Sequence, residues 1–370
     1  MATDTLFPSR HFSVDTDVIS GIGALSELAA SVRALGATRV AVVADRGVAA
    51  AGLLDRMLTA DVPVFWTGLA DVNPNVAACD SAVAAAQEAE CDAVIGVGGG
   101  SALGLAKALA IMLTNPGSIL DYEGTGRVKM PGAPLIAIPT TAGSGSEVSN
   151  ALVLHEPGRL REVVVRGRGC EPNVAILDGS SLRELPRAPM LHAALDALTH
   201  ACEALWTQNR TVMSDALAEK AARSIIDVLP AALDRRDDNS LQQLMEASTA
   251  ANLACGNTGL GLVHALSSAP TTPLPHGYQN GALLLAVAEF NWDAIDAGHH
   301  SLLARIPALF AAVGWPGHFG HDDLDTDRIE AMIAATVDHP FRTNNFRPSN
   351  DEQLRGILAA AHTSWKEIGR

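Results

Sequence analysis

Short apolar runs alternate with segments of helical length through the first half of the chain. Four such runs predict strands, at residues 39–46, 63–67, 92–98 and 134–140. The segments between them have the length and residue content of helices, at residues 47–59, 76–90 and 103–113. Strands that alternate with helices through short connections predict a mostly parallel sheet covered by helices.

Further strands are predicted up to Asp178, and after it the pattern changes. Three more apolar runs predict strands at 151–155, 161–167 and 173–178, and the first two are candidates for a hairpin. From about Pro186 the periodicity is helical and predicts no strand. Breaks between helices are expected near Pro230, residues 270–275, Trp315 and Pro340. We therefore expect an α/β domain over residues 1–182 and an all-helical domain over 183–370, with a ligand site in the cleft between them.

Composition and charge narrow the class of function. Hydrophobic residues make up 48% of the chain and charged residues only 18%, which favours a large buried core over a disordered chain. The formal net charge is -15 and the pI is near 5.1. Because such a chain repels phosphate backbones and anionic lipids, we expect neither nucleic acid nor a membrane as its partner.

The cysteines and the first residues of the chain indicate where in the cell the protein is expected to be. The five cysteines are scattered and none lies in a CxxC pair, so we interpret them as small buried hydrophobic residues in a reducing environment. The opening MATDTLFPSRHF lacks the basic and apolar regions of a secretory signal, and no apolar run has the length of a membrane span. The expected location is therefore cytoplasmic.

A glycine-rich turn follows the strand predicted at 92–98. It consists of Gly98, Gly99, Gly100 and Ser101, where the glycines let the backbone approach a ligand closely. The free N–H groups of the helix that follows attract an anion without any basic side chain, which suits an acidic protein. The turn predicts a pyrophosphate site, and a tight strand-to-helix turn without a ligand is the alternative.

A second loop and a carboxylate belong to the same expected site. The Gly/Ser-rich segment 139–147 also leaves the end of a strand, and ligands bind beyond the carboxyl ends of strands in open α/β sheets. Asp45 closes the first strand, where a carboxylate accepts hydrogen bonds from ribose hydroxyls and repels a 2′-phosphate. This favours NAD over NADP, and capping of the next helix is the alternative role for Asp45.

Four candidate metal ligands lie in the half of the chain that is predicted to be helical. Asp196 and His200 stand four residues apart, so on a helix both side chains reach one ion. His264 lies in a segment of helical character and His276 at a loop or helix start. Three imidazoles and one carboxylate suit Fe²⁺ or Zn²⁺. A single histidine is more often structural, and the spacing alone does not show that these four converge.

The motifs taken together resemble a known family. In this order, GGGSALGLAKALA, IPTTAGSGSEVS, DALTHACEA, GLGLVHALS and PHGYQNG are similar to segments of the iron-containing (group III) alcohol dehydrogenases, over residues 12–365. The resemblance implies an N-terminal dinucleotide-binding α/β domain, a C-terminal helical metal-binding domain, and a homodimer formed through an N-terminal strand. It implies metal ligation by Asp196, His200, His264 and His276. It implies cofactor binding by Asp45, Asn73, Gly98, Gly99, Gly100, Ser101, Thr140, Thr141 and Ser144.

Three features depart from the family pattern. Gly104 stands where the family usually has an aspartate, as in the related maleylacetate reductases. Ser268 stands where many members have a histidine near the nicotinamide, which puts the proton relay in doubt. The loop between His264 and His276 is shorter than usual, which reshapes the expected substrate pocket.

The expected activity is hydride transfer between a nicotinamide and a small alcohol or aldehyde, or a hydroxy or keto acid, at a metal ion. No catalytic residue is predicted beyond the metal ligands. The alternatives are reduction of an unsaturated keto acid in the manner of maleylacetate reductase, a lyase similar to dehydroquinate synthase, and a non-redox binding protein. The lyase would need several basic residues for a phosphorylated substrate, and the helical half offers few near the expected ligands.

Overall fold

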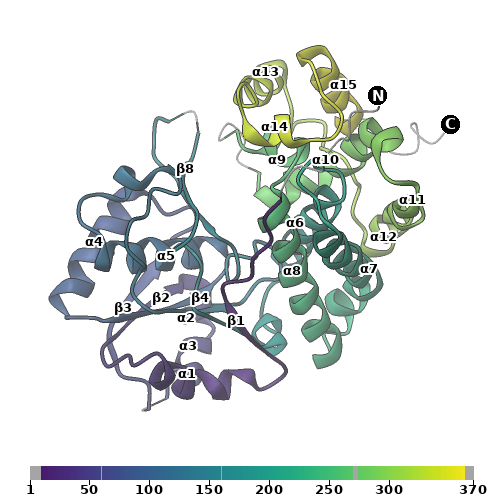
Figure 1. The fold of residues 1–370 in the computed structure, drawn as a ribbon. Helices are drawn as coiled ribbons and strands as arrows, with labels where there is room; N and C mark the ends of the chain where they lie inside the picture. Colours follow the sequence, from purple (N-terminus) through teal and green to yellow (C-terminus); the bar gives the residue numbers. More distant parts are fainter. Residues whose placement is uncertain (1–9, 60, 160, 270–273, 363–370) are drawn as a thin grey trace, which may run out of the picture.

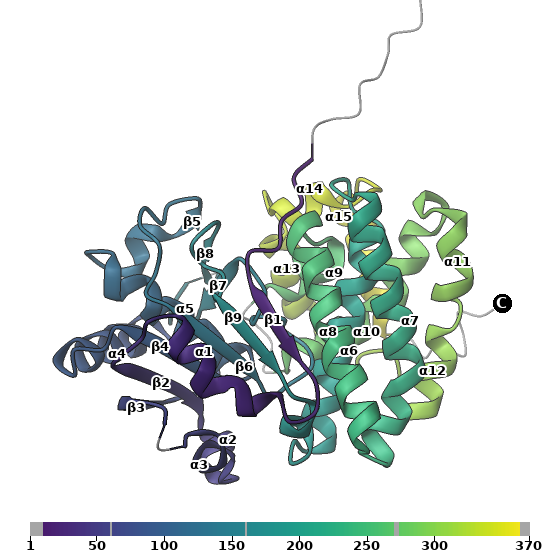
Figure 2. The same cartoon turned by 60° about the horizontal axis from the view of Figure 1, so that its bottom comes forward.

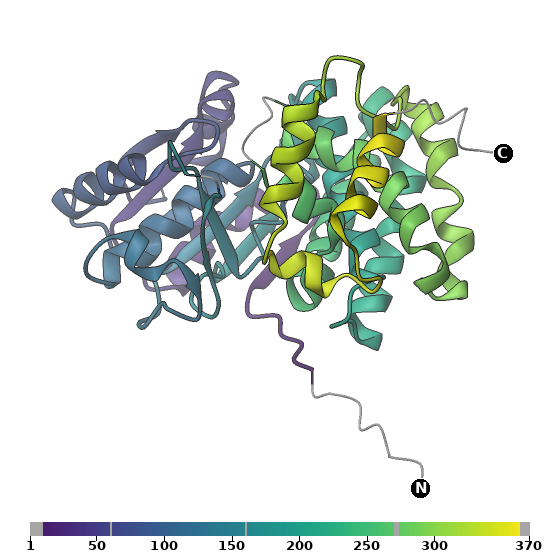
Figure 3. The same ribbon diagram turned by 90° about the horizontal axis from the view of Figure 1, so that it is seen from above.

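The computed structural model describes residues 10–59, 61–159, 161–269 and 274–362. An α/β part and a helical part lie side by side (Figure 1), and the view from above separates them most clearly (Figure 3). The α/β part ends with the strand at Val174–Leu177, and long helices follow from Arg187. This arrangement confirms the predicted fold class.

The main sheet has six parallel strands in the order β1-β9-β6-β4-β2-β3. The strands are β1 (Asp17–Ser20), β2 (Val40–Asp45), β3 (Val64–Ala70), β4 (Ala93–Gly98), β6 (Leu135–Pro139) and β9 (Val174–Leu177). Every residue of β4, β6 and β9 is buried, because helices cover both faces of the sheet. The sequence did not predict β1, whose four residues are mostly exposed at the edge of the sheet.

Helices cover the two faces of the main sheet (Figure 1). On one side lie α1 (Leu28–Ala34), α2 (Arg46–Ala50) and α3 (Leu53–Met57), and on the other α4 (Val76–Glu88) and α5 (Gly100–Thr114). The predicted stretch 47–59 is two helices, because Gly52 takes a left-handed conformation with φ 65° between them.

A second, small sheet lies beside α5. It consists of β5 (Gly124–Thr125), β8 (Val163–Arg166) and β7 (Ala151–Leu154), in that order. The antiparallel pairing of β7 with β8 confirms the expected hairpin. The sheet buries alternate residues against the core that α5 shares with α4.

The helical part contains no further strand within the described residues, apart from an isolated bridge between Thr207 and Asn345. Helices α6, α7 and α8 pack on one another, and α10 packs on α6 (Figure 2). None of the described helices has the length and hydropathy of a membrane span. The helices are α6 (Arg187–Ala204), α7 (Val212–Asp234), α8 (Asp238–Thr258), α9 (Leu262–Ser267), α10 (His276–Asn291), α11 (Ala297–Leu303), α12 (Ile306–Val313), α13 (Thr326–Ala335), α14 (Pro340–Asn344) and α15 (Asp351–His362).

The expected break at Pro230 is wrong, because α7 continues through it to Asp234. A proline inside a helix removes one backbone hydrogen bond and costs about 3 kcal/mol. Burial of Ile225, Leu229 and Leu233 against the neighbouring helices outweighs that cost.

The other expected breaks coincide with helix ends. Pro275 precedes α10, Trp315 follows α12, and Pro340 begins α14. Residues 270–273 of the expected 270–275 break lie outside the described residues.

Candidate functional site

Helix α6 carries the first two candidate ligands. Asp196 and His200 lie one turn apart on it, and each is only 6% exposed. The Nε2 atom of His200 lies 3.7 Å from Oδ1 of Asp196. The spacing of four residues therefore places both side chains on one face of the helix, as predicted.

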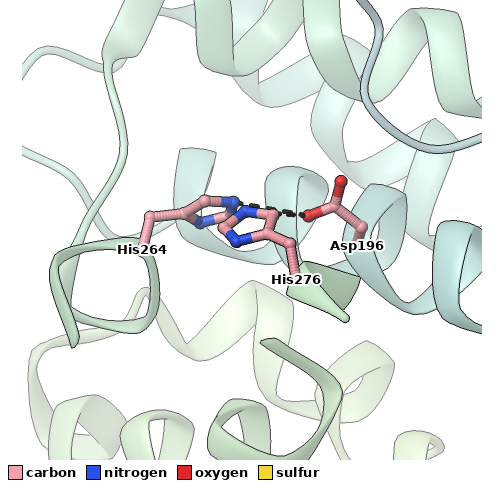
Figure 4. A group of neighbouring side chains, drawn as sticks. All are labelled: Asp196, His264 and His276. Atoms are coloured by element: carbon pink, nitrogen blue, oxygen red, sulfur yellow. Dashed lines mark ion pairs between the residues drawn. The ribbon is translucent and has the colours of Figure 1, made fainter. Parts of the chain in front are cut away.

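The next two candidates come from separate helices and meet Asp196 (Figure 4). His264 lies within α9 and His276 is the first residue of α10. Their Nε2 atoms lie 3.5 Å and 3.7 Å from Oδ1 of Asp196. The ring of His200 stacks on that of His264, with centroids 4.7 Å apart. Asp196, His264 and His276 thus form one group of ligand atoms, and His200 lies beside it against Asp196 and His264.

The donor set fits a divalent transition metal. One ligand atom each from Asp196, His264 and His276 lies within 4.8 Å of the others. Within the described part of the chain, Nδ1 of His200 is buried without a hydrogen-bond partner. Nitrogen and carboxylate donors in this ratio suit Fe²⁺ or Zn²⁺. The side chain of His276 is 51% exposed, so one side of the cluster is open to a small molecule.

The electrostatics of the cluster favour a bound cation. Burial opposes ionisation of Asp196, but the three histidines hold its pKa well below the usual range. Burial lowers the pKa of His200 to about 4. Burial also disfavours a charged His264, yet Asp196 and Glu203 raise its pKa to about 9. The two carboxylates of Asp196 and Glu203 thus favour positive charge at His264.

Glu203 is a positioning residue that the sequence analysis missed. It is fully buried on α6, and its Oε2 lies 2.7 Å from Nδ1 of His264. The same carboxylate accepts hydrogen bonds from the backbone N–H groups of Gly261 and Val263 at the start of α9. A proton on Nδ1 leaves Nε2 of His264 free for a metal. The available signal was an acidic residue within the otherwise apolar HACEALW.

Replacing Glu203 with glutamine is expected to weaken metal binding by about 10- to 100-fold. The amide cannot accept from both backbone N–H groups and from His264 at once, so α9 and its imidazole lose their fixed orientation. Competition with a chromogenic chelator measures the affinity. Glu246→Gln on the exposed side of α8 is the control, and equal affinities for the two variants would contradict the role of Glu203.

Asn280 is a second residue that the sequence analysis missed. Its amide nitrogen lies 2.6 Å from Oδ1 of Asp196 and 3.1 Å and 3.0 Å from Nε2 of His264 and of His276. The residue is fully buried, one turn after His276 on α10. The Asn280 amide therefore lies beside the same three atoms that are candidates to bind a metal, and its spacing of four residues from His276 was the available signal.

The glycine-rich turn forms the expected cradle at the end of β4. The N–H of Gly99 donates to Oδ2 of Asp45 over 2.6 Å. A Cβ atom on Gly98 would lie 2.3 Å from the same oxygen, so only glycine fits there. Asp45 precedes α2, but its side chain makes no capping hydrogen bond to it. Burial raises the pKa of Asp45, while the bond from Gly99 opposes the rise.

The second loop meets this cradle at the same edge of the sheet. Thr140 donates its N–H to the carbonyl of Gly98 over 3.0 Å. Thr141 and Ser144 lie against the glycine turn. A Cβ atom on Gly99 would lie 3.2 Å from Oγ1 of Thr141, and one on Gly100 would lie 3.0 Å from Cβ of Ser144. The N–H of Asn73 donates to Oγ of Ser101 over 3.1 Å. The structure thus brings all nine candidate cofactor residues together.

The Gly/Ser-rich loop after β6 also contacts α6, which carries two of the candidate ligands. A Cβ atom on Gly143 would lie 2.8 Å from the carbonyl of Ala193, which precedes Asp196 on α6. Asn252 on α8 donates to the carbonyl of Gly143 over 2.9 Å. The loop that borders the cradle therefore packs against α6 about one turn before Asp196.

Comparison with known proteins agrees with this geometry. The model of the iron-containing alcohol dehydrogenases matches residues 15–179, and that of the C-terminal region of the Fe-containing alcohol dehydrogenase family matches residues 190–300. The probable alcohol dehydrogenase EutG of Escherichia coli K12 is 33% identical, over 97% of each chain. The chain belongs to the iron-containing alcohol dehydrogenase family.

Solved structures show the same fold. A 1,3-propanediol oxidoreductase superposes with a TM-score of 0.90 at 25% identity, covering 96% of this chain and 100% of its own. A sulfoacetaldehyde reductase of Bifidobacterium kashiwanohense, in complex with NAD⁺, gives a TM-score of 0.89 at 25% identity, over 96% and 99%.

Two departures from the family pattern can be placed in the structure. Ser268 follows α9 and donates its hydroxyl to the carbonyl of Ala265 over 2.8 Å, within its own turn. Gly104 lies on α5 against β7, where a Cβ atom would be 3.4 Å from the carbonyl of Val153. The shortened loop between His264 and His276 includes residues 270–273, outside the described residues.

Proposed function

We propose that this member of the iron-containing alcohol dehydrogenase family is an NAD-dependent oxidoreductase that interconverts a small alcohol and its aldehyde or ketone. The observation that carries the proposal is the contact of the cofactor loop at Gly143 with α6 beside Asp196. This contact supports a proposed nicotinamide site and a proposed metal site that lie next to each other. The proposed ligands are Asp196, His200, His264 and His276, and the proposed cofactor residues are Asp45, Asn73, Gly98, Gly99, Gly100, Ser101, Thr140, Thr141 and Ser144.

The proposal assigns a role in hydride transfer to each group of residues at the site. When bound, the metal ion supplies Lewis acidity to the substrate oxygen and the nicotinamide supplies or accepts the hydride. The backbone N–H groups at the start of α5 would hold the pyrophosphate, beside the N–H of Gly99 that donates to Asp45. Asn280 and Glu203 orient the imidazoles, and the half-exposed His276 borders the side from which substrate enters. In oxidation the alcohol carbon loses a hydride to NAD⁺ and the hydroxyl proton passes to solvent.

A coupled assay tests the proposal. The purified chain, reconstituted separately with Fe²⁺ and with Zn²⁺, is given short alcohols, diols, hydroxy acids and their aldehydes with each nicotinamide. We expect alcohol-dependent NADH formation with at least one metal, and aldehyde-dependent NADH consumption in reverse. Saturated binding of metal and NAD without turnover of any member of the panel would contradict the proposal.

We expect the carboxylate of Asp45 to favour NAD. Changing Asp45 to glycine removes the charge that faces the ribose edge of the cofactor. The expected result is a shift of about 10-fold in the ratio of kcat/KM for NADP⁺ over NAD⁺, because a repulsive pair at close range is worth about 1–4 kcal/mol and about 1.4 kcal/mol corresponds to this factor. Steady-state kinetics with both cofactors measure the ratio. Asp71→Gly, at an exposed carboxylate paired with Arg46, is the control. An unchanged ratio in the Asp45 variant would contradict the assignment.

We propose further that the protein is a cytoplasmic homodimer. The free state of all five cysteines supports a reducing compartment. The exposed edge strand β1, with Val18 41% exposed, supports pairing with a second copy. Cell fractionation and sedimentation equilibrium test the two statements, and a monomer at micromolar concentration would contradict the second.

A further inference from the structure

One face of the small β5–β8–β7 sheet is left uncovered by α5. Side chains alternate along the hairpin, so one set enters the core and the other points away. The buried set is Leu152, Leu154, Val163 and Val165. The opposite set is Ala151, Val153, Val164 and Arg166. Val153 and Val164 are 41% and 38% exposed, which is unusual for valines in the centre of a hairpin.

Arg166 extends from this face to the helical part. Its Nη2 donates to the carbonyl of Gly256 on α8 over 3.3 Å, so the side chain spans the junction between the two parts. The side chain is half-buried. Neighbouring arginines of the same region pair with carboxylates, Arg159 with Glu123 and Arg168 with Asp15. In the described part of the chain, Arg166 has no carboxylate within ion-pair distance.

The backbone under Arg166 is firmly held. Arg166 is directly opposite Ala151 in the antiparallel register. The buried Lys107 donates to the carbonyls of Ser149 and Ala151 over 2.8 Å and 2.9 Å, which fixes the start of β7. A charged group mounted on such a rigid strand pair gives a precise contact to a ligand.

The position of Arg166 relates it to the metal cluster. Gly256, its partner, follows Cys255, whose thiol is buried on α8. Burial and the charge of Asp196 raise the pKa of Cys255, and the charge of Arg166 opposes them, so both groups act on the same thiol. The chain then continues from α8 into α9, which carries His264.

We infer that Arg166 is a specificity residue that binds an anionic group, a carboxylate in the simplest case, at the end of the substrate opposite its hydroxyl or aldehyde. A guanidinium presents a planar fork of donors that matches a carboxylate. Val153 and Val164 provide an apolar wall beside it. A neutral substrate end would leave the half-buried guanidinium of Arg166 without an anionic partner. Such a substrate is therefore disfavoured relative to one that carries a carboxylate. The inference rests on the proposed oxidoreductase function.

The test compares aldehydes that carry a terminal carboxylate with their methyl esters, over a series of short chain lengths. In each case hydride moves from NADH to the carbonyl carbon and the oxygen takes a proton, so only the far end of the substrate differs. For the best chain length, we expect kcat/KM for the acid to exceed that for the ester by about 100-fold. Arg166→Met should remove this preference by lowering the value for the acid only, and Arg166→Lys should retain part of it.

Arg168→Met is the matched control. It removes the same charge two residues along the chain, from a side chain that is 89% exposed, and should leave the preference unchanged. The melting temperature and metal content of each variant show that it is folded and loaded. A wild-type preference near one at every chain length, or an equal loss for acids and esters in Arg166→Met, would overturn the inference.

A binding measurement separates this inference from the proposed function. Calorimetry of short monocarboxylates with the metal-loaded NAD⁺ complex should show binding to wild type and a loss of about 10-fold or more in Arg166→Met. If neither acids nor esters are reduced while this binding persists, the proposed function fails and the anion site stands. If esters are reduced and no carboxylate binds, the anion site fails and the proposed function stands.

Discussion

Asp196→Ala is expected to lose its metal and to lower kcat/KM for alcohol oxidation by about 1,000-fold or more. Oδ1 of Asp196 is the shared neighbour of the Nε2 atoms of His200, His264 and His276, at 3.5–3.7 Å. Its removal leaves three imidazoles and no carboxylate among the proposed ligands, since Glu203 contacts His264 only through Nδ1. The Lewis acidity lost with the metal is worth several kcal/mol, and about 4 kcal/mol corresponds to this factor. Metal analysis of the purified variant, followed by steady-state kinetics, measures both effects.

Two further variants sharpen the test of Asp196. Asp196→Asn keeps the shape and one oxygen but removes the charge, so it should bind metal more weakly than wild type and more tightly than the alanine variant. His321→Ala removes a histidine whose side chain is 94% exposed and should change neither metal content nor rate. Full metal occupancy in Asp196→Ala would exclude this residue as a ligand.

Gly277→Ala is expected to displace His276 and to reduce metal occupancy severely, although the change is a single methyl group. A Cβ atom at Gly277 would lie 2.0 Å from the carbonyl oxygen of His192 and 3.3 Å from Cβ of Asp196. Because the first contact is with backbone, no side-chain rotation relieves it, and the start of α10 must move away from α6. Such overpacking costs about 1–3 kcal/mol of the free energy of unfolding. Calorimetric melting and metal analysis measure the two consequences.

Gly356→Ala is the matched control for Gly277→Ala. It lies in α15, where a Cβ atom would have no neighbour within 4 Å. Alanine is favoured over glycine in a helix by about 1 kcal/mol, so this variant should melt at the same temperature or higher. If Gly277→Ala kept wild-type metal affinity, the close packing of α10 on α6 would not control the position of His276.

The strands of the main sheet were predictable because burial on both faces leaves a local signature. β2, β4 and β6 are runs of small and branched apolar residues, and each lies within the run that predicted it. β1 has no such signature, because an edge strand with exposed residues gains its pairing from β9, far away in the sequence. The break predicted at Pro230 is wrong because packing of α7 against neighbouring helices outweighed the local helix-breaking preference of proline.

The candidate site divides in a similar way. The pairing of Asp196 with His200 follows from helical spacing, and the cofactor turn from three glycines after a buried strand. Glu203 and Asn280 gave only weak signals, because an acidic or amide residue on a helix is ordinary until its burial is known. Their roles rest on contacts to α9 and to three different ligands, which no local pattern contains.

By itself, the sequence determined the α/β-then-helical order of the chain, the glycine turn and the one-turn spacing of Asp196 and His200. These depend on local periodicity and backbone freedom, which neighbouring residues set. Only the tertiary structure decided that His264 and His276 meet Asp196, that Gly143 lies against α6, and that Arg166 reaches Gly256 across the junction with no carboxylate partner among the described residues. Those contacts join residues from separate elements, so the packing of helices and sheet, and not any nearby sequence, fixes their distances.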